Sequence, residues 1–202
     1  MLSLSKVFPL FRSFNLMMYD HPPAPVYVCD DCNPAEVRTL EFLQERGITD
    51  ANALSVLLGN IKQESNFQPT VCEGGAITRY VNCKKGGFGL IQWTTQSRYA
   101  GLLHFCARNN CDVNTLDGQL RYMWNENQFQ AQLPNFIRPR QSIEQYMKFA
   151  YPWLGWGIHG NRTLYAYDYR SKLRLEYNVN SGQSNSTMDG EQSGIRTATY
   201  SC

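Results

Sequence analysis

One glutamate, Glu64, stands where a helix with a single apolar face is expected to end. Aliphatic residues precede it at intervals of three and four, the spacing of one α-helical face: Leu54, Leu57, Leu58 and Ile61. Continuing the period of ~3.6 residues puts Glu64 on that face, and the nearby Pro69 predicts that the helix stops there. Burial and the negative end of the helix dipole would favour a protonated carboxyl, which suits a general acid for a glycosidic oxygen. The alternative is a helix-end acid that faces water.

A glycine-rich segment, Gly86–Trp93, supplies groups suited to binding a sugar. Glycine permits tight turns and close backbone approach at a cleft. Gln92 offers a donor and an acceptor for hydroxyl groups, and Trp93 offers a flat face for the C–H side of a sugar ring. We place Phe88 and Ser65 with them among the candidate substrate-binding residues. The alternative is a β-hairpin whose tryptophan fills the core.

Together the two segments, LLGNIKQESNFQP and GGFGLIQWT, resemble the phage tail lysozyme family, which includes the tail-knob cell-wall hydrolases of small Bacillus phages. More distantly, the pattern is similar to goose-type lysozymes and soluble lytic transglycosylases. The resemblance covers roughly residues 35–175 and is sharp over 54–99. It implies that Glu64 is the catalytic acid and that Gln92 lines the cleft. Family members often have an E-R-P segment further along, where this chain has His159-Gly160-Asn161-Arg162.

A second carboxylate and a far wall for the cleft are less well defined. Glu73 lies in the long loop between the two segments and is the nearest candidate for an acid that positions water or stabilises charge at the anomeric carbon. The alternative is a solvated loop acid, and transglycosylase-type relatives manage with one acid. Tyr151 and Trp156 belong to an aromatic-rich stretch, and we expect one or both to line the far side of the groove.

The composition excludes two classes of partner. The formal net charge is only +2 over 202 residues, so a broad nucleic-acid interface is not indicated. No apolar run approaches the ~18 residues that a transmembrane helix needs, so no membrane partner is expected. The first residues imitate a signal peptide weakly, because Pro9 and Arg12 interrupt the apolar region. A short arm that docks on another protein is the preferred interpretation.

The seven cysteines fall into three close pairs and one terminal residue. Close pairing favours local disulfides and an oxidising place of action. A zinc site is the rival interpretation, since Cys29 and Cys32 form a CxxC, and free buried thiols are a third. We expect no metal and no cofactor. A bridge between Cys72 and Cys83 would matter most, because it would clamp the loop that shapes the cleft.

The chain is predicted to be mainly α, with a lysozyme-like helical domain, a short glycine-rich β-like insert and extended arms at both ends. We assign residues 1–32 to an N-terminal arm, 33–175 to the catalytic domain and 176–202 to a tail rich in Ser, Asn and Gly. Cap residues and apolar spacing predict about six helices, beginning after Asn33, at Thr49 or Asp50, at Thr94 or Thr95, near Leu116, after Ser142 and at Asn161. An aromatic break is expected from Tyr151 to Gly157.

These features lead to one expected function and two rivals. We expect cleavage of the β-1,4 MurNAc–GlcNAc bond of peptidoglycan by a muramidase or a lytic transglycosylase, the choice being open. The resemblance implies a virion protein of the phage tail that acts on the host cell wall and periplasm during DNA entry, with other tail proteins bound by the terminal arms. The rivals are a structural tail component with a retired lysozyme fold and an endolysin that acts at lysis.

Overall fold

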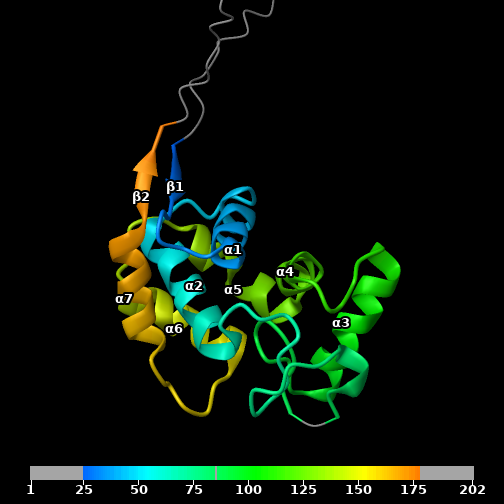
Figure 1. The fold of residues 1–202 in the computed structure, drawn as a ribbon. Helices are drawn as coiled ribbons and strands as arrows, with labels where there is room; N and C mark the ends of the chain where they lie inside the picture. The colour runs from blue at the N-terminus through cyan, green and yellow to red at the C-terminus, as the bar shows by residue number, and fades with distance from the viewer. Residues whose placement is uncertain (1–24, 85, 178–202) are drawn as a thin grey trace, which may run out of the picture. The chain divides into compact units, whose positions relative to one another are not determined.

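The computed structural model describes residues 25–84 and 86–177, and this part of the chain is mainly helical, as predicted (Figure 1). Its helices, in chain order, are α1 (Pro34–Gln44), α2 (Ala51–Ser65), α3 (Gln96–Asn109), α4 (Leu116–Asn125), α5 (Asn127–Ile137), α6 (Ile143–Leu154) and α7 (Arg162–Lys172). A short 3-10 helix covers Tyr80–Asn82. Strands β1 (Val26–Val28) and β2 (Arg174–Glu176) pair antiparallel, with Tyr27 opposite Leu175. This pair brings the two ends of the domain together.

The predicted arms lie mostly outside the described residues. Residues 1–24 and 178–202 are not described, so the expected arm and tail are untested there. Residues 25–32, which we assigned to the N-terminal arm, are instead part of the domain: they form β1 and a turn closed by the Cys29–Cys32 disulfide. These residues belong to the domain because β1 pairs with β2, and no local sequence pattern predicts that pairing.

Side chains cap the starts of the first two helices. The Asn33 side chain accepts hydrogen bonds from the N–H groups of Ala35 and Glu36, and the Glu36 carboxylate accepts one from the Asn33 N–H, which completes a capping box. Asp50 caps α2 through the N–H groups of its second and third residues. At the other end of α2, Asn66 adopts a left-handed conformation with φ 49°. The predicted helix that ends close to Glu64 is therefore present.

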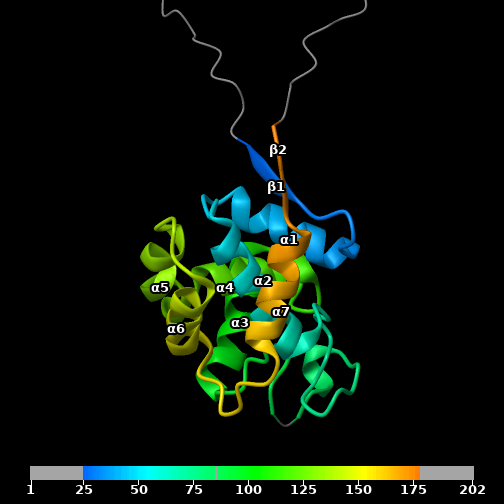
Figure 2. The same cartoon turned by 90° about the vertical axis from the view of Figure 1, so that its left-hand side faces the viewer.

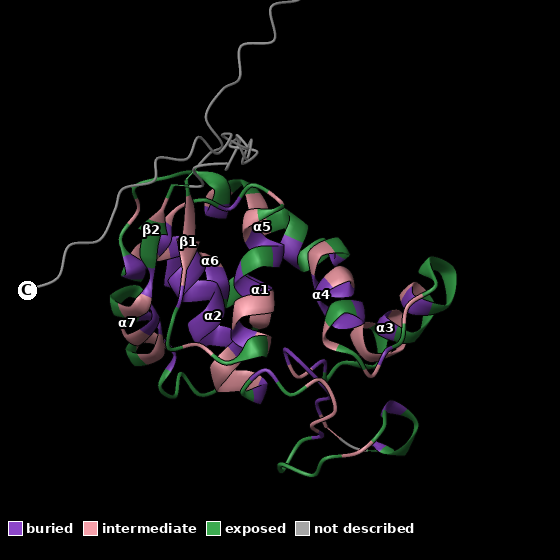
Figure 3. Cartoon of the chain, turned by 45° about the horizontal axis from the view of Figure 1, so that its top comes forward, coloured by how far each residue is buried: buried purple, intermediate pink, exposed green. Residues whose placement is uncertain are grey.

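Helix α2 is the buried centre of the domain. Its residues from Ala53 to Ile61 are all buried (Figure 3), and α7, α6 and α1 pack against it. Figure 2 shows α7 alongside α2. The two helices approach closely at Gly59, where an added Cβ would lie 2.6 Å from the backbone nitrogen of Ala166. Each leucine buried here stabilises the fold by ~1.5–3 kcal/mol, so α2 is a rigid support for whatever its end presents.

Two prolines lie inside helical segments that we did not predict from the sequence. Helix α5 was not predicted, and α6 continues through Tyr151 to Leu154, where we expected a break. Pro134 lies within α5 and Pro152 within α6. A proline leaves the carbonyl four residues earlier without its helical donor. Those carbonyls belong to Gln130 and Lys148, both exposed residues.

The cysteines form three local disulfides, as the close pairing indicated: Cys29–Cys32, Cys72–Cys83 and Cys106–Cys111. The zinc interpretation gains no support, because residues 25–84 and 86–177 contain no group of three potential metal ligands. Cys202 lies outside the described residues. The Cys72–Cys83 bridge closes the loop that leads from α2 to the glycine-rich segment.

Candidate active site

Glu64 is the last residue but one of α2, and its side chain keeps 14% of its exposure. It faces Arg162, the first residue of α7, whose Nη2 donates a hydrogen bond to Glu64 Oε1. The Arg162 side chain is 5% exposed, so the ion pair is largely shielded from water. Periodicity predicted the buried side of the helix for Glu64, and the structure places it at the edge of that side.

The charge state of Glu64 results from opposing effects. Burial raises the pKa of its carboxyl above the ordinary value. The positive charges of Arg162 and Arg98 lower that pKa and partly offset the rise, and the hydrogen bond from Arg162 acts in the same direction. The net direction is upward. A carboxyl with a raised pKa holds its proton closer to neutral pH, as a general acid requires.

The glycine-rich segment is fastened to the end of α2 and to α4. The Ser65 hydroxyl donates to the Leu90 carbonyl oxygen at 2.8 Å. The fully buried Gln119 of α4 accepts from the Leu90 N–H at 2.7 Å and donates to the carbonyls of Pro69 and Val113 at 2.6 and 2.7 Å. Gly89, at φ 73°, makes room for this amide, since an added Cβ would lie 2.4 Å from Gln119 Oε1. The segment is thus set in one position relative to Glu64.

Gln92 and Glu73 both brace this loop. The half-buried Gln92 has φ 50°, and its Nε2 donates to the carbonyl oxygens of Gly89 at 3.0 Å and Val71 at 3.3 Å. Glu73 is exposed; its Oε2 accepts from the Gly87 N–H at 2.9 Å, and its own N–H donates to the Gly87 carbonyl at 2.8 Å. A sugar contact from Gln92 and a second acid role for Glu73 stay predictions.

Phe88 and Trp93 are not binding surfaces in this structure. Both rings are fully buried, so their burial lends no support to ligand contact, which stays a prediction for both residues. Phe88 packs edge-on against Tyr80, and Trp93 lies 5.2 Å from the Tyr122 ring. The alternative, a turn whose tryptophan fills the core, describes them better. Ser65 is also buried and serves the fold through Leu90; direct contact with substrate stays a prediction for it.

An aromatic group lies next to the Glu64–Arg162 pair. The Arg162 guanidinium is 4.7 Å from the centroid of the Trp156 ring. Trp156 in turn meets Tyr151 edge-on at 5.0 Å and His159 at 5.8 Å. Tyr151 is 53% exposed. Trp156 and Tyr151, the two aromatic candidates for the far wall of the cleft, are therefore connected to Glu64 through Arg162. Contact of Tyr151 with a glycan stays a prediction.

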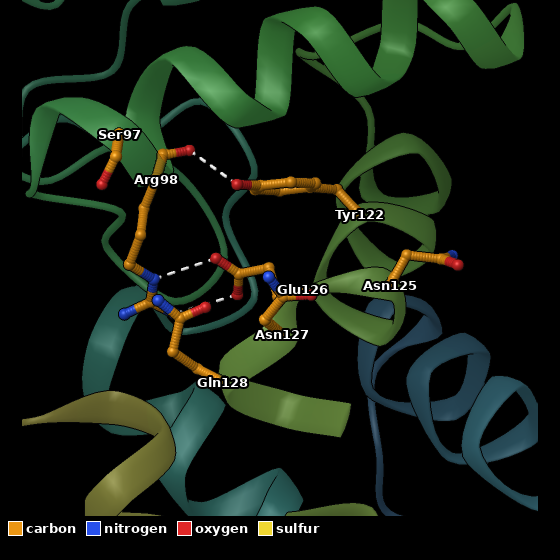
Figure 4. A pocket seen from close by; sticks show the side chains of 7 residues that line it. All are labelled: Ser97, Arg98, Tyr122, Asn125, Glu126, Asn127 and Gln128. Atoms are coloured by element: carbon orange, nitrogen blue, oxygen red, sulfur yellow. Dashed lines mark hydrogen bonds and ion pairs between the residues drawn. The ribbon is translucent and has the colours of Figure 1, made fainter. Parts of the chain in front are cut away.

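A polar pocket of about 340 Å³ opens beside a second ion pair (Figure 4). Arg98 of α3 donates from Nε and Nη2 to the two oxygens of Glu126, both at 2.9 Å, and Glu126 is 4% exposed. The Tyr122 hydroxyl donates to the Arg98 carbonyl at 2.9 Å. Amide side chains complete the lining, which consists of Ser97, Arg98, Tyr122, Asn125, Glu126, Asn127 and Gln128. Arg98 connects this pocket with Glu64, because its charge also lowers the pKa of that carboxyl.

Sequence reasoning missed Arg162, Gln119 and the Arg98–Glu126 pair as parts of the site. A signal existed for Gln119, which lies three residues after Leu116 on the apolar stripe of α4, where a polar side chain has to be satisfied internally. The two arginines gave no such signal. Each meets its glutamate across the fold, at separations of 98 and 28 residues.

Comparisons with known proteins give a family match over much of the chain. The sequence profile of the phage tail lysozyme family matches residues 35–157. The chain is 34% identical over 90 residues to morphogenesis protein 1 of Bacillus phage B103. That match covers 42% of this chain and 21% of the relative, so the chain spans about a fifth of the relative's length. No solved structure gives a significant match.

Proposed function

Because the chain belongs to the phage tail lysozyme family, we propose that it cleaves the β-1,4 MurNAc–GlcNAc bond of peptidoglycan with Glu64 as general acid. The observation that supports this most is the position of Glu64: a largely shielded carboxyl at the end of a rigid helix, next to a segment fastened by Ser65 and Gln119. Glu64 donates its proton to the leaving oxygen as the glycosidic bond breaks.

Two routes complete the reaction. In a muramidase, water attacks the anomeric carbon; in a lytic transglycosylase, the sugar's own 6-hydroxyl attacks and leaves an anhydro end. Glu73 is the candidate to orient water in the first route, and no second acid is needed in the second. We favour neither from the contacts of Glu73, because it is an exposed residue held by the Gly87 N–H.

The proposed setting is the tail of a phage particle, where the enzyme would open the host cell wall for DNA entry. The family and the phage relative support this setting. Other tail proteins would be bound by the terminal arms, which lie outside the described residues. An endolysin acting at lysis is the alternative setting, and detection of the chain in purified virions by mass spectrometry separates the two.

A second candidate function is a structural role in phage assembly without catalysis. The relative's name, morphogenesis protein, favours it. The two candidates differ in what happens to purified peptidoglycan, because an assembly protein would leave its glycan strands intact.

The decisive experiment compares wild type with Glu64→Gln on purified peptidoglycan under oxidising conditions, with released fragments identified by mass spectrometry. We expect wild type to release muropeptides and the variant to be slower by ~10²–10⁴-fold, the usual contribution of a positioned acid. Glu41→Gln, a change of an exposed glutamate on α1, is the matched control and should leave the rate unchanged. An anhydro product, one water lighter than a reducing end, would identify the transglycosylase route. Release by Glu64→Gln at the wild-type rate would refute the acid assignment, and no release by wild type would favour the assembly role.

A further inference from the structure

Arg162 is held more firmly than a surface arginine that happens to meet an acid. Its Nη1 donates to the carbonyl oxygens of Ile158 at 3.1 Å and His159 at 2.8 Å. Its guanidinium packs on Trp156, and its Nη2 reaches Glu64. The segment before it is anchored as well, since Gln63 of α2 accepts a hydrogen bond from the Asn161 N–H at 2.7 Å. The guanidinium therefore has one position, set by the backbone.

The other basic side chains of this region have partners of their own. Arg98 is occupied by both oxygens of Glu126, and Lys62 lies 3.7 Å from Glu36. The His159 ring is hydrogen-bonded to Thr163 at 2.8 Å. Among the described residues, Glu64 is the one carboxylate that pairs with Arg162. Glu64 and Arg162 thus form a one-to-one ion pair within the candidate site.

The pairing also distinguishes the two oxygens of Glu64. A guanidinium only donates hydrogen bonds, so the oxygen it contacts, Oε1, cannot also present a proton to it. Oε2 has no hydrogen-bond partner in residues 25–84 and 86–177, and it is not among the buried polar atoms left without one. The proton of the neutral carboxyl therefore belongs on Oε2, the oxygen that Arg162 does not occupy.

We propose that Arg162 is a positioning residue for the glycosidase reaction: it fixes Glu64 through Oε1, directs the acid proton to Oε2, and stabilises the carboxylate that forms when the proton leaves. This inference rests on the proposed function. As the proton moves from Oε2 to the glycosidic oxygen, the bond from that oxygen to the anomeric carbon breaks and its electron pair stays on the leaving oxygen. Glu64 becomes an anion beside a cation already in place. The attacking water or 6-hydroxyl then returns a proton to Glu64.

The positioning role of Arg162 predicts a change in the pH dependence of activity that a purely structural role does not predict. Arg162 lowers the pKa of Glu64, so removing its charge should raise that pKa and keep Glu64 protonated to higher pH. If activity needs the protonated acid, the alkaline limb of the pH–rate profile should move upward. The maximal rate should fall, because the carboxylate product loses its stabilising charge and the acid its fixed orientation.

The test measures peptidoglycan cleavage against pH for wild type, Arg162→Gln, Arg162→Lys and Arg46→Gln. We expect Arg162→Gln to move the alkaline limb upward by about 1 pH unit and to slow the maximal rate by ~10-fold or more. Arg162→Lys should restore the limb but only part of the rate, because an ammonium keeps the charge and loses the planar fork. Arg46 is the matched control: it also packs on an aromatic ring, Phe42, and donates to a backbone carbonyl, yet lies outside the site. Its variant should keep the wild-type limb.

Direct titration of the Glu64 carboxyl distinguishes a changed pKa from activity that is lost because a variant is misfolded. Carbon-13 NMR of glutamate-labelled protein follows the Glu64 carboxyl, which is assigned by its absence in Glu64→Gln. The midpoint should rise in Arg162→Gln and stay near wild type in Arg162→Lys. An active wild type whose alkaline limb and Glu64 midpoint are the same in Arg162→Gln would overturn the inference alone. A wild type that cleaves nothing at any pH would overturn the proposed function and this role with it.

Discussion

The replacement Gln119→Leu should destabilise the domain strongly although it removes no charge and little volume. Gln119 is fully buried and satisfies three backbone groups, the Leu90 N–H and the carbonyls of Pro69 and Val113. Leucine satisfies none of them. An orphaned buried group costs ~1–3 kcal/mol. Leu90 and Val113 are buried, whereas Pro69 is half-buried and its carbonyl is closer to water.

The expected loss follows from counting those groups. Two fully orphaned groups and one partly hydrated carbonyl cost ~3–5 kcal/mol, from which ~1 kcal/mol is recovered because the glutamine amide no longer has to be desolvated. A net loss of about 3 kcal/mol is a large share of the free energy of unfolding of a typical domain. For a domain of this size it lowers Tm by roughly 6–12 °C.

Urea unfolding followed by circular dichroism measures the loss, and hydrogen exchange at the Leu90 amide locates it. The control is Asn60→Leu in α2. Asn60 is also fully buried, but its amide donates only to the Val56 carbonyl of its own helix and to the Met147 sulfur, and its Oδ1 has no partner. That replacement strands no loop backbone group and should cost less than ~1 kcal/mol. A loss below ~1 kcal/mol for Gln119→Leu, or an equal loss for both variants, would refute the role assigned to Gln119.

Three further predictions concern the loop and the acid. Gly89→Ala should lower the free energy of unfolding by ~2 kcal/mol or more, and the control Gly47→Ala by ~1 kcal/mol. Both glycines have positive φ, but an added Cβ meets nothing within 4 Å at Gly47, whereas at Gly89 it meets a buried amide. Thermal unfolding of the two variants measures the difference. Replacing Cys72 and Cys83 together with serine should cost ~2–3 kcal/mol in denaturant titration and reduce cleavage, because the bridge closes the loop beside the site; an unchanged midpoint would contradict this. The folded-state pKa of Glu64 is raised, so the stability it contributes is present below its unfolded pKa and is lost as pH rises through the folded pKa. Glutamine does not titrate, so the Tm of wild type minus that of Glu64→Gln should fall as pH rises above the ordinary pKa of a glutamate. A constant or rising difference would contradict the direction of the shift.

The helix that presents Glu64 could be predicted from the sequence because its determinants are local. Four aliphatic residues at helical spacing and a cap at Asp50 define α2 without reference to the rest of the chain. The fold class, the capping box of α1 and the pairing of neighbouring cysteines were accessible for the same reason. Each depends on residues within about one helix length of one another.

What the sequence did not predict depends on contacts between distant residues. Trp93 was assigned to sugar binding from its side-chain type, yet its ring lies in the core against Tyr122 of α4. Whether an aromatic ring faces solvent or core is decided by the packing of other elements, which residue type does not encode. Pro134 and Pro152 lie inside α5 and α6, although an interior proline removes a helical hydrogen bond and crowds the preceding turn.

The two ion pairs of the candidate site differ in how the arginine binds the carboxylate. Glu64 and Glu126 are both largely shielded, both face an arginine, and both arginines belong to other elements. Both oxygens of Glu126 accept charge-assisted hydrogen bonds from Arg98. Glu64 has one oxygen bound and one open. Both oxygens of Glu126 are therefore committed to holding Arg98, whereas Glu64 keeps one oxygen available for the acid role proposed for it. The number of carboxylate oxygens that the arginine occupies, rather than burial, is what distinguishes the two pairs.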